Sequence, residues 1–228
     1  DFPDLERDPV FLAVTADDRY PFMGTELLAS TGARFGVRAF SDHVVEEHVA
    51  RSNALHARLD GLPVYEVGPL ARFNLNFEQL PDPLKQLARQ LGLEPPVTNP
   101  FRSLLVRGIE VLYALEVGAT EAEGVVDGPA RVPVPRTEGV GHGVSEAPRG
   151  TLYHRYDIGP DGKIRVADIV PPTSQNQRAI EADLRSVAPS LRDQDDEAAR
   201  HRAEMAIRNY DPCISCATHF LTLTREEL

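Results

Sequence analysis

The chain carries the stretch Asp211-Pro212-Cys213-Ile214-Ser215-Cys216-Ala217-Thr218-His219, which contains both of its cysteines. Two cysteines separated by two residues can turn both sulfur atoms toward one point, and paired thiolates suit a soft metal ion. Disulfide-stapled domains instead use several cysteines that lie far apart in the sequence. The cysteine pair therefore predicts a metal or redox site.

Several known kinds of cysteine site can be weighed against this spacing. Haem attachment needs a histidine directly after the second cysteine, and here Ala217 and Thr218 intervene. A thioredoxin-type pair precedes a helix of a βαβ unit, whereas this pair follows a predicted helix. A structural zinc site needs four ligands, so Cys213, Cys216 and His219 would require His142 or His154 as the fourth. A zinc site and a pair of buried, reduced cysteines both stay open as alternatives.

Length, composition and charge narrow the class of protein. The 228 residues are 42% hydrophobic and 26% charged, which fits one globular domain, or one domain with a long elaboration. Acidic residues outnumber basic ones 35 to 24, and the net charge of -11 disfavours nucleic acid and anionic lipid as partners. No apolar run reaches the ~18 residues of a membrane-spanning helix. The first residues lack a basic segment followed by an apolar core, so we expect a cytoplasmic protein, and the absence of an initial Met is consistent with a fragment.

Hydrophobic spacing and turn residues predict an α+β fold that is mainly helical. A helix is expected over residues 41–59, ended by Gly61. A β-hairpin is expected from residues 151–158 and 163–170, and the segment 118–150 shows no period and is expected to be a long loop. Further helices are expected over residues 82–91, 176–187 and 194–208, and after Asn99-Pro100, where Phe101, Leu104, Leu105, Ile109, Leu112 and Leu115 are expected to point inward.

Three other segments have distinctive sequences and precede the cysteine-bearing stretch. In chain order they are Val67-Gly68-Pro69-Leu70-Ala71-Arg72-Phe73-Asn74, then Glu146-Ala147-Pro148-Arg149-Gly150 followed by Leu152 and His154, then Pro172-Thr173 with Asn176.

Together, and in this order, the four segments resemble the conserved blocks of the large (catalytic) subunit of nickel–iron hydrogenases. The resemblance covers nearly the whole chain, residues 1–228, but only as the C-terminal half of that subunit. It implies helix-bundle elements with a β-hairpin, and reversible heterolytic cleavage of H₂ with electrons passed to an iron–sulfur small subunit. The ending Ser215-Cys216-Ala217-Thr218-His219 is similar to that of the cytoplasmic, pyridine-nucleotide-linked branch.

The resemblance also implies roles for the two cysteines. Cys213 would be a terminal nickel ligand, and Cys216 would bridge nickel to an iron that carries carbon monoxide and cyanide. In the family, nickel sits in four thiolates, and this chain supplies two. The other pair belongs to an N-terminal half of the large subunit, so the resemblance implies that these residues are inactive alone.

Arg149 and Asp211 are the other catalytic residues that the resemblance implies. The Arg149 guanidinium would lie over the open metal position and bond a cyanide, since arginine presents several donors in a rigid fork. Asp211 would orient it. The alternative is a plain ion pair of Arg149 with Asp211 or with Glu146.

Pro148, Pro172 and Thr173 would be the cofactor-binding positions. For Thr173, the alternative is a structural hydrogen bond at a helix N-terminus. His219 would help to bind a magnesium ion together with the backbone carbonyl of Ile169 and a carboxylate of the absent half, its alternative being an unliganded surface histidine.

Maturation is the last implication of the resemblance. In most of the family an endopeptidase cuts after the terminal histidine once the metals are inserted, so residues 220–228 would be a removable peptide. The implied partners are that endopeptidase, nickel-insertion proteins, the N-terminal half and the small subunit. A non-catalytic interaction protein of the same fold, zinc-stabilised or metal-free, is the alternative function.

Overall fold

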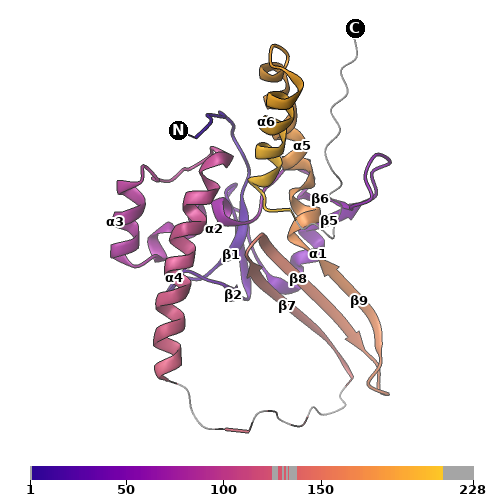
Figure 1. The fold of residues 1–228 in the computed structure, drawn as a ribbon. Coiled ribbons are helices and arrows are strands. Elements are labelled where there is room, and N and C mark those ends of the chain that lie inside the picture. Colours follow the sequence, from indigo (N-terminus) through magenta and orange to yellow (C-terminus); the bar gives the residue numbers. More distant parts are fainter. Residues whose placement is uncertain (1, 125–127, 130, 132, 134–137, 213–228) are drawn as a thin grey trace.

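The structure is a computed structural model that describes residues 2–124, 128, 129, 131, 133 and 138–212. It is an α+β fold in which helices predominate, as predicted (Figure 1). No helix in this described part is long and apolar enough to cross a membrane. The strands are β1 Leu12–Thr15, β2 Met23–Gly24, β3 Glu26–Ala29, β4 Arg34–Gly36, β5 Val44–Glu47, β6 His56–Leu59, β7 Gly139–Ala147, β8 Gly150–Ile158 and β9 Ile164–Val170; the α-helices are α1 Phe40–His43, α2 Pro69–Asn76, α3 Asp82–Gln90, α4 Ser103–Glu123, α5 Pro172–Leu191 and α6 Asp196–Arg208.

The strands form small antiparallel sheets with the orders β1-β3-β4, β2-β7-β8-β9 and β5-β6. Long β7, β8 and β9 make a ribbon that extends from the body of the molecule, while α5 and α6 stand beside each other at its opposite end (Figure 1). One core cluster lies among β1, α2, α3 and α4, and a second joins β1, β3, β6, β7 and β8. Strand β1 contributes to both clusters and so links the helical part to the sheets.

Most of the expected elements are present. The hairpin of β8 and β9 turns at Gly162, whose φ of +76° lies in the region that favours glycine. Helix α3 has Pro83 in its first turn and is followed by Gly92 at φ +73°. Helix α5 extends beyond the expected residues 176–187 at both ends, whereas α6 begins two residues after the expected start at 194 and ends at Arg208 as expected. The Asp195 side chain caps α6 by accepting from the Ala198 amide.

The helix expected over residues 41–59 is wrong. One turn, α1, is followed by the hairpin of β5 and β6, with Val44 opposite Leu59. Val44 is buried and Val45 is exposed, so this segment follows the two-residue period of a strand. Val44 and Val45 are both β-branched, which also favours a strand. The helical prediction failed because the apolar spacing of this segment fits the period of a helix as well as that of a strand.

The long loop expected over residues 118–150 is partly wrong, since α4 continues to Glu123 and β7 begins at Gly139. The glycines of β7 hid the strand, because glycine gives no alternation of polar and apolar side chains. Pairing along the whole of β8, from Gly139 opposite Ile158 to Ala147 opposite Gly150, holds this weak strand former extended.

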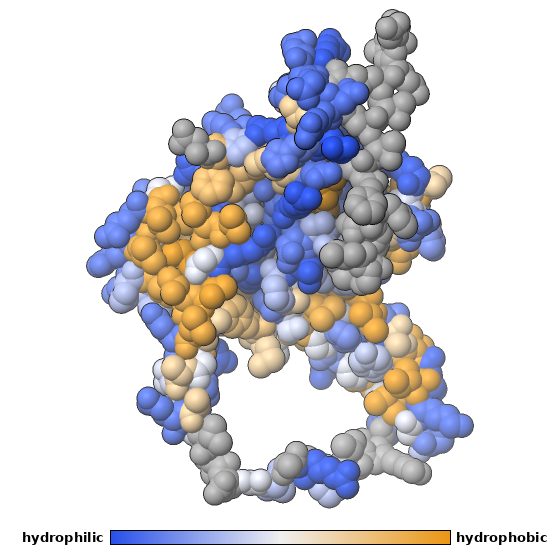
Figure 2. Space-filling model, viewed as in Figure 1, coloured by the Kyte–Doolittle hydropathy of each residue, from blue (hydrophilic) through white to orange (hydrophobic). Residues whose placement is uncertain are grey.

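Helix α4 also differs from expectation in which residues it buries. Phe101 just before it and Ile109 within it are buried as expected, but Leu104, Leu112 and Leu115 are 61%, 41% and 65% exposed. Val106 and Tyr113 point into the core instead. Figure 2 shows hydrophobic residues gathered on the surface over α4. The helix is therefore apolar on two faces, of which the described residues cover one.

Candidate functional site

The predicted catalytic arginine sits at the tip of a tight turn. Ala147 of β7 pairs with Gly150 of β8, which leaves Pro148 and Arg149 as the turn residues. Gly150 has a φ of +137°, a conformation that is strained for residues with a side chain. The two strands therefore hold Arg149 at a defined place at the edge of the body.

This turn packs directly against the start of α2. A Cβ built on Gly68, which has a φ of +118°, would lie 2.7 Å from the carbonyl oxygen of Arg149. A Cβ on Gly150 would lie 2.5 Å from Cγ2 of Val67 and 2.9 Å from the Gly68 nitrogen. Only glycines at both positions allow the two backbones to approach this closely.

Asn176, in the first part of α5, joins the third segment to the same point. Its side chain accepts from the Val67 amide at 2.9 Å and donates to the Val67 carbonyl at 3.1 Å, as a neighbouring strand would. It also donates to the Arg149 carbonyl at 3.4 Å. One buried amide therefore fixes α2, the Arg149 turn and α5 relative to one another.

A second arginine, Arg72 of α2, supports the turn from inside. Its guanidinium donates to both Glu110 oxygens at 2.6 and 2.7 Å, to Glu146 at 3.0 Å and to the Ala147 and Pro148 carbonyls at 2.8 and 3.3 Å. The side chain is fully buried. Burial lowers the pKa of Arg72, but the two carboxylates outweigh this, and the net pKa lies above the ordinary value.

Glu146 is the buried partner of Arg72, and this decides one of the alternatives for Arg149. Its carboxylate also accepts from the Val14 amide at 2.9 Å and from the Thr151 hydroxyl at 2.8 Å. Burial raises the pKa of Glu146, although Arg72 and these hydrogen bonds oppose that rise. The ion pair of Arg149 with Glu146 is thus not formed.

Arg149 reaches Asp211 instead. The Arg149 Nε donates to the Asp211 backbone carbonyl and lies 3.5 Å from its Oδ2. The two side chains are 37% and 47% exposed, so the charge pair itself is worth little. The two terminal nitrogens of Arg149 make no hydrogen bond with the described residues.

The backbone before Asp211 is held by two sets of contacts. Ser103 and Arg107 of α4 both donate to the Asn209 carbonyl, the serine at 2.9 Å. The hydroxyl of Tyr210 donates to Asp183 at 2.7 Å. Asp211 itself has a φ of +48° and therefore redirects the chain after α6. These contacts hold the backbone up to the residues that directly precede the cysteine pair in the sequence.

Tyr210 belongs to a buried charged cluster around Arg7. The Arg7 guanidinium donates to the Tyr210 hydroxyl at 2.9 Å and to the Thr98 carbonyl at 2.6 Å, and it pairs with Glu66 at 2.7 Å and with Asp183 at 3.3 Å. Burial raises the pKa of Glu66 despite the Arg7 charge beside it. The N-terminal segment, α5 and the end of α6 are joined by this cluster.

Neither buried network was predicted from the sequence. Arg72 lies in a quoted segment, but nothing local distinguishes it from a surface arginine. The one available signal is its place between buried Ala71 and Phe73 in an apolar helical turn. The residues missed are Arg7, Glu66, Arg72, Glu110, Asp183 and Tyr210.

The other predicted site residues that the structure describes lie on α5 and β9. Pro172 begins α5 and is buried, and Thr173 follows it in the first turn. Ile169, on β9, is 47% exposed and pairs with His154 of β8. Cys213, Cys216 and His219 lie outside the described residues.

The histidines of the zinc alternative both have tyrosine partners. His142 Nδ1 lies 3.0 Å from the Tyr153 hydroxyl, and His154 Nδ1 lies 3.0 Å from the Tyr156 hydroxyl. Within the described ranges no three His, Cys, Asp or Glu side chains are grouped as a metal site would require. These contacts do not identify His142 or His154 as the fourth ligand of a zinc site.

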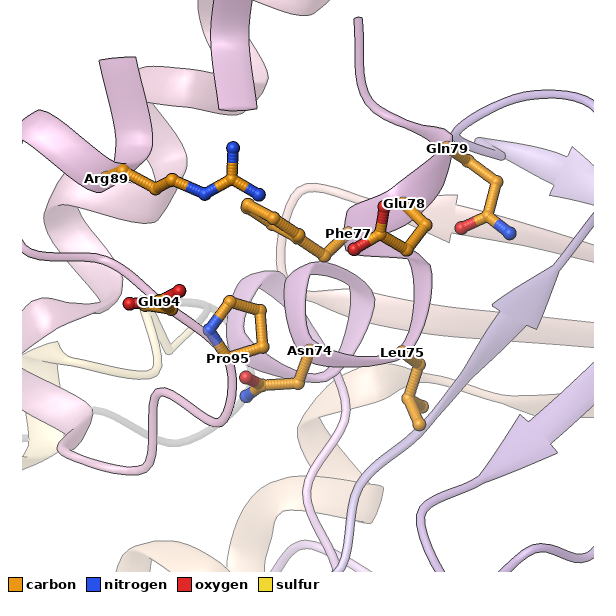
Figure 3. A pocket seen from close by; sticks show the side chains of 8 residues that line it. All are labelled: Asn74, Leu75, Phe77, Glu78, Gln79, Arg89, Glu94 and Pro95. Carbon is orange, nitrogen blue, oxygen red and sulfur yellow. The ribbon is translucent and has the colours of Figure 1, made fainter. Parts of the chain in front are cut away.

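A pocket of about 310 Å³ lies elsewhere, between the end of α2 and the loop after α3 (Figure 3). The Arg89 guanidinium lies over the Phe77 ring at 5.4 Å, and Glu78 and Glu94 stand at the rim. No predicted site residue lines it. The convergence at Arg149 is the better candidate site, because four separate segments build it.

Comparisons with known proteins agree with the fold and the segments. Residues 43–219 match the family model described as nickel-dependent hydrogenase. Sulfhydrogenase 1 subunit alpha of Pyrococcus furiosus is 32% identical over 97% of this chain and 52% of its own length. The NAD-reducing hydrogenase HoxS subunit beta of Cupriavidus necator is 38% identical over 68% of this chain and 34% of its own length.

A solved structure shows the same fold. The chain resembles an NAD⁺-reducing [NiFe]-hydrogenase in the H₂-reduced state with a TM-score of 0.73 and 27% identity. The match covers 92% of this chain and 51% of that one. The chain therefore spans about half the length of the relatives it matches.

Proposed function

This chain belongs to the nickel-dependent hydrogenase family, and on that premise we propose that it is the C-terminal half of a hydrogenase large subunit. The proposed reaction is the reversible heterolytic cleavage of H₂. One observation carries the proposal: the family segments converge so that Arg149 meets Asp211, two residues before the first cysteine of the pair.

The cofactor that we propose for this site is a nickel–iron centre with carbon monoxide and cyanide on iron. Such a centre supplies the cleavage of H₂ and accepts its electrons. Thiolates hold soft metals, so Cys213 is proposed as a terminal nickel ligand and Cys216 as the bridge to iron. The chain provides half of the four thiolates, which is why it is proposed to be inactive alone.

Arg149 is proposed to bind and orient at the open side of that centre. Its Nε donates to the Asp211 carbonyl, and this contact is proposed to restrain the side chain so that its two terminal nitrogens face the ligand. Those terminal donors can bond a cyanide nitrogen while a positive charge faces H₂. The Asp211 carboxylate, 3.5 Å from the same Nε, is proposed to help orient the guanidinium.

The remaining site residues keep the roles that the resemblance gives them. Pro148, Pro172 and Thr173 are proposed to lie against the cyanides, Thr173 through its hydroxyl. His219 and the Ile169 carbonyl are proposed to hold a magnesium ion with a carboxylate from the other half. Residues 220–228 are proposed to be removed by a maturation endopeptidase; a subunit from the mature native complex whose intact mass still includes them would refute this.

The partners proposed are the N-terminal half, an iron–sulfur small subunit that receives the electrons, and nickel-insertion proteins. Two of the similar proteins are NAD-reducing hydrogenases, which supports electron exchange with a pyridine nucleotide. A cytoplasmic location is proposed with that branch.

Infrared spectroscopy of the native complex that contains this chain tests the function. Carbon monoxide and cyanide on iron absorb where protein does not, so their bands are the expected result. If a fully processed complex shows no such bands and contains stoichiometric zinc without nickel or iron, the non-catalytic interaction protein replaces the hydrogenase.

A further inference from the structure

His56 of β6 is fully buried, and neither of its ring nitrogens has a hydrogen-bond partner among the described residues. A buried polar group without a partner is unfavourable, because it has lost the water that bonded it in the unfolded chain. Protonation would worsen this, since the imidazolium ring carries a positive charge and a second donor. The site therefore accepts His56 in its neutral form and disfavours its charged form.

The charged side chains near His56 come from the hairpin of β5 and β6 and from α5, which packs against β6. Three of them are arginines and two are glutamates, so they offer a protonated ring no excess of negative charge. Burial lowers the pKa of His56, while the Glu181 charge opposes this and the Arg51 charge adds to it. The five groups are Glu47, Arg51, Arg58, Arg178 and Glu181.

The hairpin is attached to α5 by ion pairs and by buried side chains. Arg178 of α5 pairs with Glu47 of β5, and Arg51 donates to Glu181 of α5 at 2.9 Å. Arg51 lies in the loop between the strands, which projects from the body of the molecule (Figure 1), and its side chain is 57% exposed. Its pair therefore contributes little. Because an isolated two-stranded hairpin is marginally stable, the attachment depends on the buried side chains, His56 among them.

We propose that His56 makes the attachment of the β5–β6 hairpin to α5 sensitive to pH, because protonation of the imidazole releases the hairpin. In the released form water solvates the ring, which takes up its proton near the ordinary pKa of 6.5, whereas the buried ring resists protonation. The attachment is therefore complete well above pH 6.5 and weakens as the pH falls through that value.

The switch acts on an element of the candidate site. Asn176 of α5, the helix to which the hairpin attaches, donates to the Arg149 carbonyl. The inference goes beyond the proposed function and does not depend on it, because attachment of the hairpin can be measured without an assay of H₂ turnover.

Amide hydrogen exchange in the native complex tests the switch. Exchange rates of residues 44–59, corrected for the intrinsic effect of pH, report how often the hairpin opens. Glu46 also titrates here: burial raises its pKa, so its protonation opposes opening as the pH falls. The quantity to compare is therefore the rate in the unmodified chain divided by the rate in His56→Gln. Glutamine does not titrate, and the contribution of Glu46 cancels in this ratio.

From about pH 7.5 to about pH 5.5 the ratio should rise by up to about tenfold, the change for one proton that only the open form takes up with a pKa of 6.5. His48→Gln is the matched control, because His48 is exposed in the loop of the same hairpin, and its ratio should stay constant. A constant ratio for His56→Gln would overturn the proposal. A falling ratio would overturn it as well, since the protonated ring would then tighten the hairpin.

A second measurement needs no variant and decides the matter if His56→Gln does not fold. Exchange of the imidazole C2 hydrogen, followed by mass spectrometry over a series of pH values, reports the pKa of each histidine in the unmodified complex. The pKa of His56 should lie below 6.5. A pKa at or above 6.5 would mean that the buried site accepts the charged ring, which contradicts the switch.

Discussion

The Cα of Gly68 lies so close to the Arg149 carbonyl that a Cβ on Gly68 would be 2.7 Å from the oxygen. That contact sets the position of the Arg149 turn against α2. It explains why a glycine precedes Pro69 at the start of this helix, where its φ of +118° would strain any other residue.

Gly68→Ala should displace the Arg149 turn. The expected loss of unfolding free energy exceeds that of Gly32→Ala by about 1–3 kcal/mol, because overpacking adds to the cost of positive φ. Gly32 is the matched control, since its φ is +91° and a Cβ there meets nothing within 4 Å. Urea unfolding of both variants measures the difference, and equal losses would refute the close contact.

Arg72→Met should destabilise the chain by about 3–5 kcal/mol, because it leaves the Glu110 and Glu146 carboxylates buried without their cation. The control is Arg34→Met, which removes an exposed pair with Glu26 and should cost at most ~1 kcal/mol. Urea unfolding compares the two. A loss for Arg72→Met no larger than the control would mean that the carboxylates are not buried as described.

Arg149→Lys should leave the metals in the complex but lower H₂ turnover sharply, since a point charge cannot reproduce the fork. Asp211→Asn should lower turnover less, because the backbone carbonyl that holds the Arg149 Nε remains. H₂ oxidation assays and metal analysis of both variants provide the test. Normal turnover in Arg149→Lys would exclude the assigned role.

Tyr210→Phe should cost about 1–3 kcal/mol, since it leaves buried hydrogen-bond partners on Arg7 and Asp183 unsatisfied. Amide exchange at residues 209–211 should quicken as well, because the hydroxyl anchors that backbone. Tyr156→Phe serves as control, as its hydroxyl bonds only a half-buried histidine. Unchanged exchange at residues 209–211 would show that Ser103 and Arg107 suffice to hold the segment.

The pH dependence of stability should carry a contribution from Glu66. Burial raises the pKa of Glu66 above the ordinary 4.5, so the folded chain binds this proton more tightly than the unfolded chain. The resulting stability is fully present below the ordinary pKa and is lost as the pH rises through that value toward the raised one.

Glu66→Gln replaces the titrating carboxyl group with an amide that does not titrate. Its unfolding free energy minus that of the unmodified chain should therefore rise between pH 4.5 and 7, measured by urea unfolding at several pH values. A difference that stays constant over this range would contradict the raised pKa.

Local signals made much of the fold predictable. Helix α3 has proline in its first turn and glycine after its end, and the β8–β9 hairpin has a glycine-rich turn between two β-rich runs. Such signals act over a few residues, so the sequence displays them directly. The segment from Val44 to Leu59 fits a helical spacing and a strand spacing alike, and its pairing as β5 and β6 depends on which side chains the core accepts.

The candidate site, too, was predictable from the sequence only in part. The sequence by itself determined which donors are available: paired thiols two residues apart, an arginine in a proline–glycine turn, and an aspartate before the cysteines. Only the tertiary structure decided that Glu146 pairs with Arg72 and that Arg149 meets Asp211, and only it showed which face of α4 the described residues bury. The reason is physical: ion-pair partners and buried faces depend on packing between residues far apart in the chain, and local spacing carries no record of that packing.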